Sequence, residues 1–172
     1  QLWDISEDRV LVSLENPYGI LIGWIFRPDG LKLAGITKDE KVLLWDTDTG
    51  ELELVFDISI VPIRQVDYQY ENRVAYGVSS ERFTEYGLDF SPDGRLLAFG
   101  NGNTIEIWDV SSGTLINSLQ QSLAPAFATR VSFSKDGNLL YAVINRNQEA
   151  QVWNVHSGRL LKQLNLPIVN QN

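Results

Sequence analysis

The sequence contains no cysteine and no methionine, and its 172 residues include a single histidine. Without cysteine, disulfide bonds and thiolate metal sites are excluded, and the redox compartment is left open. A Ser-His-acid triad would have to use His156, and no Gly-x-Ser-x-Gly turn is present to carry its nucleophile. Because no methionine can serve as an initiator, we expect the N-terminus to have been cut from a longer protein.

Basic residues are also scarce, since 14 Lys and Arg stand against 22 Asp and Glu and give a formal net charge of -8. Such a field repels a phosphate backbone, so we expect no general binding to nucleic acid. Long hydrophobic runs are absent, because Ser, Asn, Gln, Thr and Pro interrupt the longest uncharged stretch, 110–129. We therefore expect no membrane span, and no signal peptide is visible.

What the sequence does contain is a β-rich unit at 88–119. Four short runs with β patterning lie at 88–90, 95–99, 104–108 and 114–119. Turn residues separate them: a Ser-Pro-Asp-Gly turn follows the first run and an Asn-Gly-Asn hairpin signal follows the second. The third run alternates apolar and polar residues, as a half-buried strand does. The unit is therefore predicted to be a four-stranded antiparallel meander.

Two motifs of this unit recur along the chain. The turn motif Phe-x-x-Asp-Gly contributes the aspartates Asp29, Asp93 and Asp136. The second motif, a tryptophan followed by Asp or Asn, contributes Trp3, Trp45, Trp108 and Trp153. The first two tryptophans are 42 residues apart and the last two are 45 apart. A period of about 40–45 residues with a Trp-Asp dipeptide is typical of four-stranded propeller blades.

In these motifs the chain resembles the WD40-repeat β-propellers over nearly its whole length. The resemblance implies an all-β fold, a propeller segment of about four blades, each a four-stranded antiparallel sheet, with the ring incomplete in this chain. It also implies inner strands near 20–26, 86–90 and 129–133, with the Trp-Asp pair ending each third strand. The motif tryptophans and aspartates are then structural repeat residues. We expect Trp24, within an inner strand, to be a core residue as well.

The chain departs from that family in its buried polar residues. Family members often carry a Gly-His pair whose histidine is bonded to a serine, an aspartate and the tryptophan, and no such histidine is present here. The aspartate expected six residues before the tryptophan occurs only as Asp39, with Gly102 and Asn147 in the other two places. We therefore expect this polar network to be largely missing and the blades to cohere by apolar packing.

We interpret 1–172 as one propeller segment whose spacing is broken once. Its expected parts are a partial blade at 1–14, full blades at 20–56, 86–119 and 129–166, and a degenerate or truncated blade at 64–83. Tyr68 lies 42 residues after Phe26, in phase, yet only 22 residues before Phe90. Three explanations stay open: a natively two-stranded blade, residues missing near 80–81, or a hairpin inserted in a loop. We favour the loss of outer strands, which leaves the inner core of a ring intact.

No stretch of the sequence assembles catalytic or metal-binding groups. The Asp-Thr-Asp at 46–48 begins like a calcium loop, but Gly50 and Glu51 stand where a ligand and the required glycine should be, so we predict a turn. The segment 100–103 is too short for a phosphate-binding loop, and His156 is predicted to be a surface turn residue. Paired carboxylates from different blades stay open, and otherwise we expect no enzyme, no cofactor and no metal.

A propeller presents wide faces made of loops, which generally serve recognition through aromatic and arginine anchors. The loops from outer to inner strands and from second to third strands share one face. On that face we expect the binding residues Tyr18, Arg64, Arg82, Phe83, Phe127, Arg130 and Arg146. We predict a non-catalytic scaffold or sensor module of a larger protein, with a protein or peptide partner and with the missing blades or another copy as neighbours. The alternatives are a propeller that accompanies or gates a hydrolase and a purely structural assembly ring.

Overall fold

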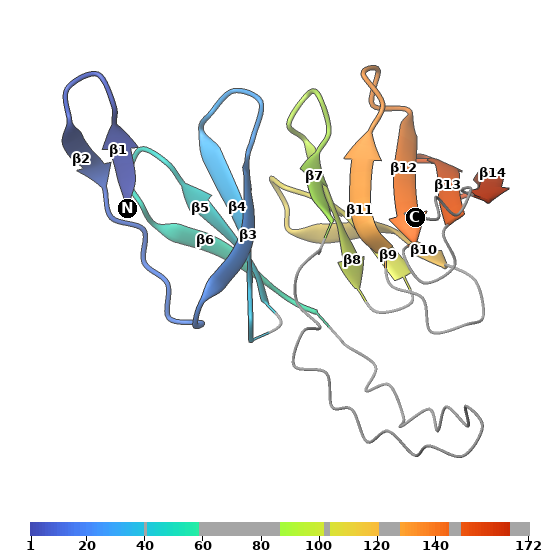
Figure 1. The fold of residues 1–172 in the computed structure, drawn as a ribbon, viewed down its shortest axis with the longest axis horizontal. Coiled ribbons are helices and arrows are strands. Elements are labelled where there is room, and N and C mark those ends of the chain that lie inside the picture. The colour runs from blue at the N-terminus through green and yellow to red at the C-terminus, as the bar shows by residue number, and fades with distance from the viewer. Residues whose placement is uncertain (40, 59–86, 102–103, 121–127, 145–148, 166–172) are drawn as a thin grey trace, which may run out of the picture.

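The computed structural model of the protein describes residues 1–39, 41–58, 87–101, 104–120, 128–144 and 149–165. These residues form fourteen β-strands, β1 to β14, and no helix (Figure 1). Among them there is accordingly no helix with the length and apolar character needed to cross a membrane. The strands make one two-stranded and three four-stranded antiparallel sheets, and within the described residues they do not close into a ring. The predicted all-β fold of four-stranded blades is confirmed.

Each four-stranded sheet follows the order of the sequence, as a meander does. Blade A consists of β3 (Leu21–Phe26), β4 (Lys32–Thr37), β5 (Lys41–Asp46) and β6 (Leu52–Asp57). Blade B consists of β7 (Leu88–Phe90), β8 (Leu96–Asn101), β9 (Thr104–Asp109) and β10 (Thr114–Gln120). Blade C consists of β11 (Ala128–Phe133), β12 (Leu139–Ile144), β13 (Glu149–Asn154) and β14 (Leu160–Asn165). Ahead of them lies the N-terminal pair, β1 (Leu2–Asp4) and β2 (Arg9–Val12).

The turn between the first and second strands is built in the same way in all three blades. Its glycine has a positive φ of between 69° and 77°, which a residue without Cβ adopts at little cost. One residue earlier, Asp29, Asp93 and Asp136 each accept a hydrogen bond from the backbone N–H two residues further on, at 3.0 to 3.1 Å. The recurring aspartates therefore shape these turns.

A second recurring turn joins the third and fourth strands and begins at Asp46, Asp109 and Asn154. The Oδ1 atom of Asp46 accepts hydrogen bonds from the N–H groups of Asp48 and Thr49, each at 2.9 Å. The side-chain oxygens of the other two residues accept equivalent bonds at 2.8 to 3.0 Å. The Asp-Thr-Asp segment is thus a turn, as the sequence predicted.

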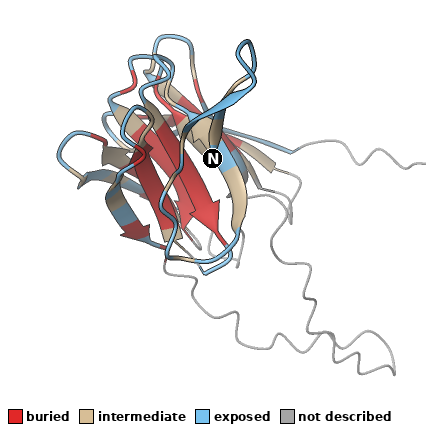
Figure 2. Cartoon of the chain, turned by 90° about the vertical axis from the view of Figure 1, so that its left-hand side faces the viewer, coloured by how far each residue is buried: buried red, intermediate tan, exposed pale blue. Residues whose placement is uncertain are grey.

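The blades stand side by side, and their first strands β3, β7 and β11 contact one another in that order. Blade B turns one face towards blade A and the other towards blade C. An apolar cluster of buried side chains fills the space between blades A and B, and a second fills the space between B and C. In Figure 2, buried residues run along the strands of the stack, while the turns are exposed.

The repeat tryptophans pack as predicted only where another blade covers them. Trp45 and Trp153 are buried and Trp108 is half-buried, but Trp3, in the N-terminal pair, is 52% exposed. Their indole N–H groups find acceptors that the sequence did not indicate. Trp108 Nε1 donates to Glu106 Oε2 at 2.8 Å. Trp153 donates to Gln151, two residues before it, at 3.2 Å, and Trp45 donates to a backbone carbonyl of the loop before β3 at 2.6 Å.

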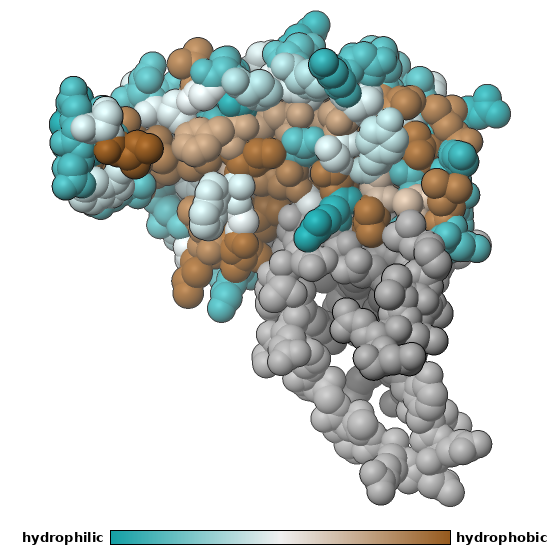
Figure 3. Space-filling model, turned by 45° about the horizontal axis from the view of Figure 1, so that its top comes forward, coloured by the Kyte–Doolittle hydropathy of each residue, from teal (hydrophilic) through white to brown (hydrophobic). Residues whose placement is uncertain are grey.

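The expectation that Trp24 is a core residue is wrong. Trp24 is 66% exposed, and Phe26, on the same face of β3, is 47% exposed. This face of blade A looks towards the N-terminal pair, whose residues cover the middle of the sheet around Trp45. The pair has the two strands that flank the Trp-Asp turn and none that would stand opposite β3. In Figure 3, apolar side chains reach the surface over this part of the molecule.

The predicted degenerate or truncated blade at 64–83 lies outside the described residues. The blades on either side of this segment are direct neighbours, since β3 contacts β7 and both blades contribute to one apolar cluster. The division of the chain into blades at 64–83 stays a prediction.

Candidate binding surfaces

The loop end of the molecule is the lower end in Figure 1, where the chain enters each inner strand. Two members of the predicted binding face, Tyr18 and Arg130, belong to the described residues. Arg130 is exposed, and it lies within β11 and not in the loop before it. The other five members, Arg64, Arg82, Phe83, Phe127 and Arg146, lie outside the described residues.

Tyr18 has a fixed position in the loop between β2 and β3. The Oδ1 atom of Asn16 accepts a hydrogen bond from the Tyr18 N–H at 3.0 Å, and Asn16 Nδ2 donates to the carbonyl of Gly19 at 2.7 Å. The N–H of Lys38 donates to the carbonyl of Ile20 at 2.9 Å, which ties this loop to the turn between β4 and β5. The half-buried Tyr18 packs against the apolar cluster around Trp45. It therefore combines a core contact with a position at the loop end.

The turn end, opposite the loop end, carries a groove between blades B and C. The turns that follow the first and third strands form this end, which is the upper end in Figure 1. The groove has a volume of about 570 Å³, and its lining includes Asp93, Leu96, Asp109, Ile116, Asp136 and His156. His156 is exposed in the turn after β13, which confirms the surface turn position predicted for it.

Hydrogen bonds keep the carboxylates of this groove charged. The Ser111 hydroxyl is the main cause that lowers the pKa of Asp109 to about 2. The Ser134 hydroxyl does the same for Asp136, whose pKa also falls to about 2. The pKa of Asp93 is lowered in the same way, first by the hydroxyl two residues earlier and then by a backbone N–H. The groove is therefore lined by three carboxylates that stay ionised at neutral pH.

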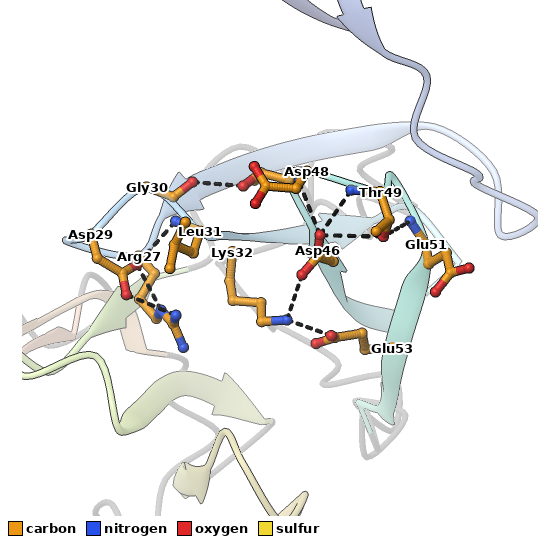
Figure 4. A network of polar contacts seen from close by, with 11 residues as sticks. Arg27, Asp29, Gly30, Leu31, Lys32, Asp46, Asp48, Thr49, Glu51 and Glu53 are labelled. Carbon is orange, nitrogen blue, oxygen red and sulfur yellow. Dashed lines mark hydrogen bonds and ion pairs between the residues drawn. The ribbon is translucent and has the colours of Figure 1, made fainter.

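Between blades A and B, two basic side chains occupy the turn end (Figure 4). Arg27 binds Asp29 through two contacts, Nε to Oδ1 at 2.8 Å and Nη2 to Oδ2 at 2.7 Å. Lys32 Nζ donates to Asp46 Oδ2 at 3.0 Å and also to Glu53. Both basic side chains are largely buried, with 19% of Arg27 and 16% of Lys32 exposed. Arg27 is thus held by a two-point contact with one carboxylate, and Lys32 is shared between two carboxylates.

The described residues bring together no group of three or more His, Asp or Glu side chains suited to hold a metal ion. What the two ends offer is an anchored aromatic side chain, exposed charges and a groove lined by carboxylates. Of these features, an anchored aromatic side chain is common at recognition surfaces.

Comparison with known proteins identifies the repeat unit. The family model described as "WD domain, G-beta repeat" matches residues 86–109, which run from the inner strand β7 to the end of β9. The chain is 33% identical over 115 residues to the WD repeat-containing protein 26 homolog of Drosophila melanogaster, covering 65% of this chain and 15% of that protein. These matches support the WD40-repeat family for this chain. Proteins with WD40 repeats generally act as non-catalytic scaffolds that bind other proteins.

Two further WD40-type relatives match along more of the chain. The small ribosomal subunit protein RACK1y of Oryza sativa subsp. japonica is 22% identical over 147 residues, covering 83% of this chain and 37% of that protein. An uncharacterized WD repeat-containing protein of Synechocystis sp. is 29% identical over 157 residues, covering 77% of this chain and 44% of that protein. The chain thus spans between 15% and 44% of the length of these three relatives.

Proposed function

We propose that this WD40 segment is a non-catalytic module of a larger protein and binds a protein or peptide partner at its loop end. The observation that carries the proposal is the setting of Tyr18, whose backbone N–H is bound by Asn16 and whose side chain packs against the core. Exposed Arg130 adds a cationic group to an otherwise acidic chain. Tyrosine and arginine are among the residue types that dominate binding energy at protein interfaces.

The proposed surface extends to the five residues that the sequence assigns to the same end. They are Arg64, Arg82, Phe83, Phe127 and Arg146. Four of the seven residues of the complete set are arginines and three are aromatic, a composition that favours an acidic or aromatic peptide as partner.

The experiment compares two double variants with a matched control in the tagged full chain. Tyr18→Ala with Arg130→Ala, and Arg82→Ala with Phe83→Ala, each remove two anchors from the loop end. Asp48→Ala, in an exposed turn of blade A at the other end, is the control. A partner isolated with the unmodified chain is then titrated against all variants. We expect affinity to fall about tenfold or more in the double variants and to stay unchanged in the control. Unchanged affinity in both double variants, with loss in the control, would overturn the proposal.

A specific observation also favours assembly with another blade. Trp24 and Phe26 are exposed on the face of blade A that, in blades B and C, a preceding blade covers. We propose that this face packs against a further blade, from the same propeller or from a second copy. Sedimentation should then show association of the isolated chain, reduced by replacing Trp24 and Phe26 with serine. A compact monomer of 19.4 kDa would contradict this.

Nothing among the described residues favours the hydrolase alternative.

A further inference from the structure

The turn ends of blades A and B occupy equivalent positions in the repeat but carry different side chains. Strand register pairs Lys32 with Asp46 in blade A and Leu96 with Asp109 in blade B, which fixes the equivalence of these positions. The two aspartates of the turns are kept from blade A to blade B, while the groups around them change. The equivalent pairs are Arg27 and Ser91, Asp29 and Asp93, Lys32 and Leu96, Asp46 and Asp109, and Glu53 and Ile116.

Between blades A and B, the cations of blade A fill the groove. Arg27 lies against the first turn of blade B, since a Cβ added at Gly94 would be 2.9 Å from its Cδ atom. Its guanidinium group binds Asp29, and Lys32 binds Asp46 and Glu53 (Figure 4). In this groove Asp29, Asp46 and Glu53 are thus each in contact with a basic side chain of the same blade.

Between blades B and C, the same place is open. The Ser91 hydroxyl donates a hydrogen bond to Asp93 at 2.6 Å. The side chains of Leu96 and Ile116 carry no charge. Gly137, the equivalent of Gly94, has a proline carbon of blade B as its nearest neighbour, 3.6 Å from an added Cβ, where Gly94 has the arginine. The groove of about 570 Å³ occupies this space.

The lining of the open groove suits a long cationic side chain. Leu96, Ile116 and Val155 provide an apolar floor for a methylene stem, and the ionised aspartates provide acceptors for its charged head. Arg95 and Lys135 also line the groove, but both are exposed and the three aspartates outnumber them. A planar guanidinium fits best, because its donors match a carboxylate at two points, as Arg27 does in the neighbouring groove.

We propose that the groove between blades B and C binds an arginine side chain of a protein partner, in the place that Arg27 and Lys32 fill between blades A and B. This site lies at the turn end and is separate from the surface proposed at the loop end. A partner that engages both ends would gain from two linked contacts.

The test titrates the isotope-labelled full chain with the peptide acetyl-Gly-Ala-Arg-Ala-Gly-amide, followed by NMR. The matched control peptide carries citrulline, which keeps the shape of arginine and removes its charge. We expect the arginine peptide to shift the signals of Leu96, Ile116 and Val155, and the citrulline peptide to bind about tenfold more weakly or worse. Equal binding of the two peptides, or shifts gathered around Tyr18 instead, would overturn the proposal.

Two variants locate the site within the chain. Ser91→Arg with Leu96→Lys and Ile116→Glu copies the filled groove of blade A into blade B and should abolish peptide binding. Asp109→Asn keeps the turn, because Asn154 already holds the equivalent turn in blade C, and should weaken binding several-fold. If the triple variant fails to fold, Asp109→Asn decides the question. Unchanged affinity in a folded variant refutes the site, whereas failure of the loop-end proposal leaves this titration unaffected.

Discussion

The interface between blades A and B differs from the one between blades B and C in what holds its centre. In the first interface aromatic rings meet: the Phe56 ring centroid is 4.8 Å from that of Trp108 and 5.8 Å from that of Phe99. The rings of Phe99 and Trp108 are stacked at 6.5 Å. Such contacts add to the stabilisation from burial of apolar area.

The second interface combines an apolar cluster with hydrogen bonds that join blade B to blade C. Asp89 Oδ2 accepts a bond from the N–H of Phe133 at 2.8 Å, and Asn117 Nδ2 donates to the carbonyl of Val155 at 2.7 Å. The residues of blade A at the positions of Asp89 and Asn117 are apolar. The repeat therefore fixes where side chains point, while the residue at each position decides whether rings or hydrogen bonds close an interface or whether it stays open to a partner.

The largest expected effect comes from the aromatic interface. Phe99→Ala should lower the free energy of unfolding by about 4 kcal/mol, because it leaves a cavity beside two rings. Leu140→Ala, in the other interface, should cost about 3 kcal/mol through loss of packing within its apolar cluster. Urea denaturation followed by tryptophan fluorescence measures both. A smaller loss for Phe99 than for Leu140 would contradict the importance given to the rings.

Two equivalent glycines differ in how closely the backbone of a neighbouring blade approaches them. A Cβ at Gly87 would lie 2.4 Å from the backbone nitrogen of Val131 in blade C, whereas nothing lies within 4 Å of a Cβ at Gly23 in blade A. Gly87→Ala should therefore cost about 3 kcal/mol, since a backbone cannot easily move aside. The control Gly23→Ala should be neutral or slightly stabilising. Equal midpoints of thermal unfolding for the two variants would contradict this packing.

A smaller effect is expected from the hydrogen bond between blades B and C. Asp89→Ala leaves the N–H of Phe133 without its acceptor and should cost about 1.5 kcal/mol. Asp89→Asn keeps an oxygen at this position and should recover most of that loss. Hydrogen exchange at the Phe133 amide reports the bond directly, with faster exchange expected in the alanine variant. Unchanged protection there would show that Asp89 does not hold the interface.

The smallest effect concerns the turn carboxylates as the pH falls. The pKa of Asp109 is about 2 in the folded chain, below its ordinary value of 3.8. Because its pKa is lower in the folded state, ionised Asp109 stabilises the folded chain at pH values above 3.8. This contribution is lost as the pH falls from 3.8 towards about 2. Asp109→Asn lacks this contribution, so it should be less stable than the unmodified chain near neutral pH and lose less stability on acidification. Denaturant midpoints measured from about pH 6 to pH 2 test this, and parallel curves for the two proteins would contradict it.

The strands could be predicted from the sequence because their signals are local. Turn chemistry at the aspartates and glycines sets the strand ends, so the run predicted at 104–108 is found as β9 and the inner strand predicted at 129–133 is found as β11. Indole acceptors could not be predicted from the family pattern, although Glu106 and Gln151 precede their tryptophans by two residues. That spacing places both side chains on one face of a strand, and it is the signal that was missed.

The exposure of Trp24 could not be predicted, because it depends on what stands opposite β3 and not on β3 itself. The groove between blades B and C could not be predicted for the same reason. The replacement of Arg27 by Ser91 can be read from the aligned repeats, but it opens a groove only because blade C is the neighbour of blade B. Local pattern gives the blades, and the order of neighbours gives the surfaces.

The central claim is that blades A and B are direct neighbours although 59–86 lies between them in the sequence. The nuclear Overhauser effect between the ring protons of Phe56 and Trp108 tests it, because the two ring centroids are 4.8 Å apart and the residues belong to different blades. Strong cross-peaks between these rings are predicted. The absence of these cross-peaks, in a spectrum that retains the contacts between Leu97 and Trp108 within blade B, would contradict the account.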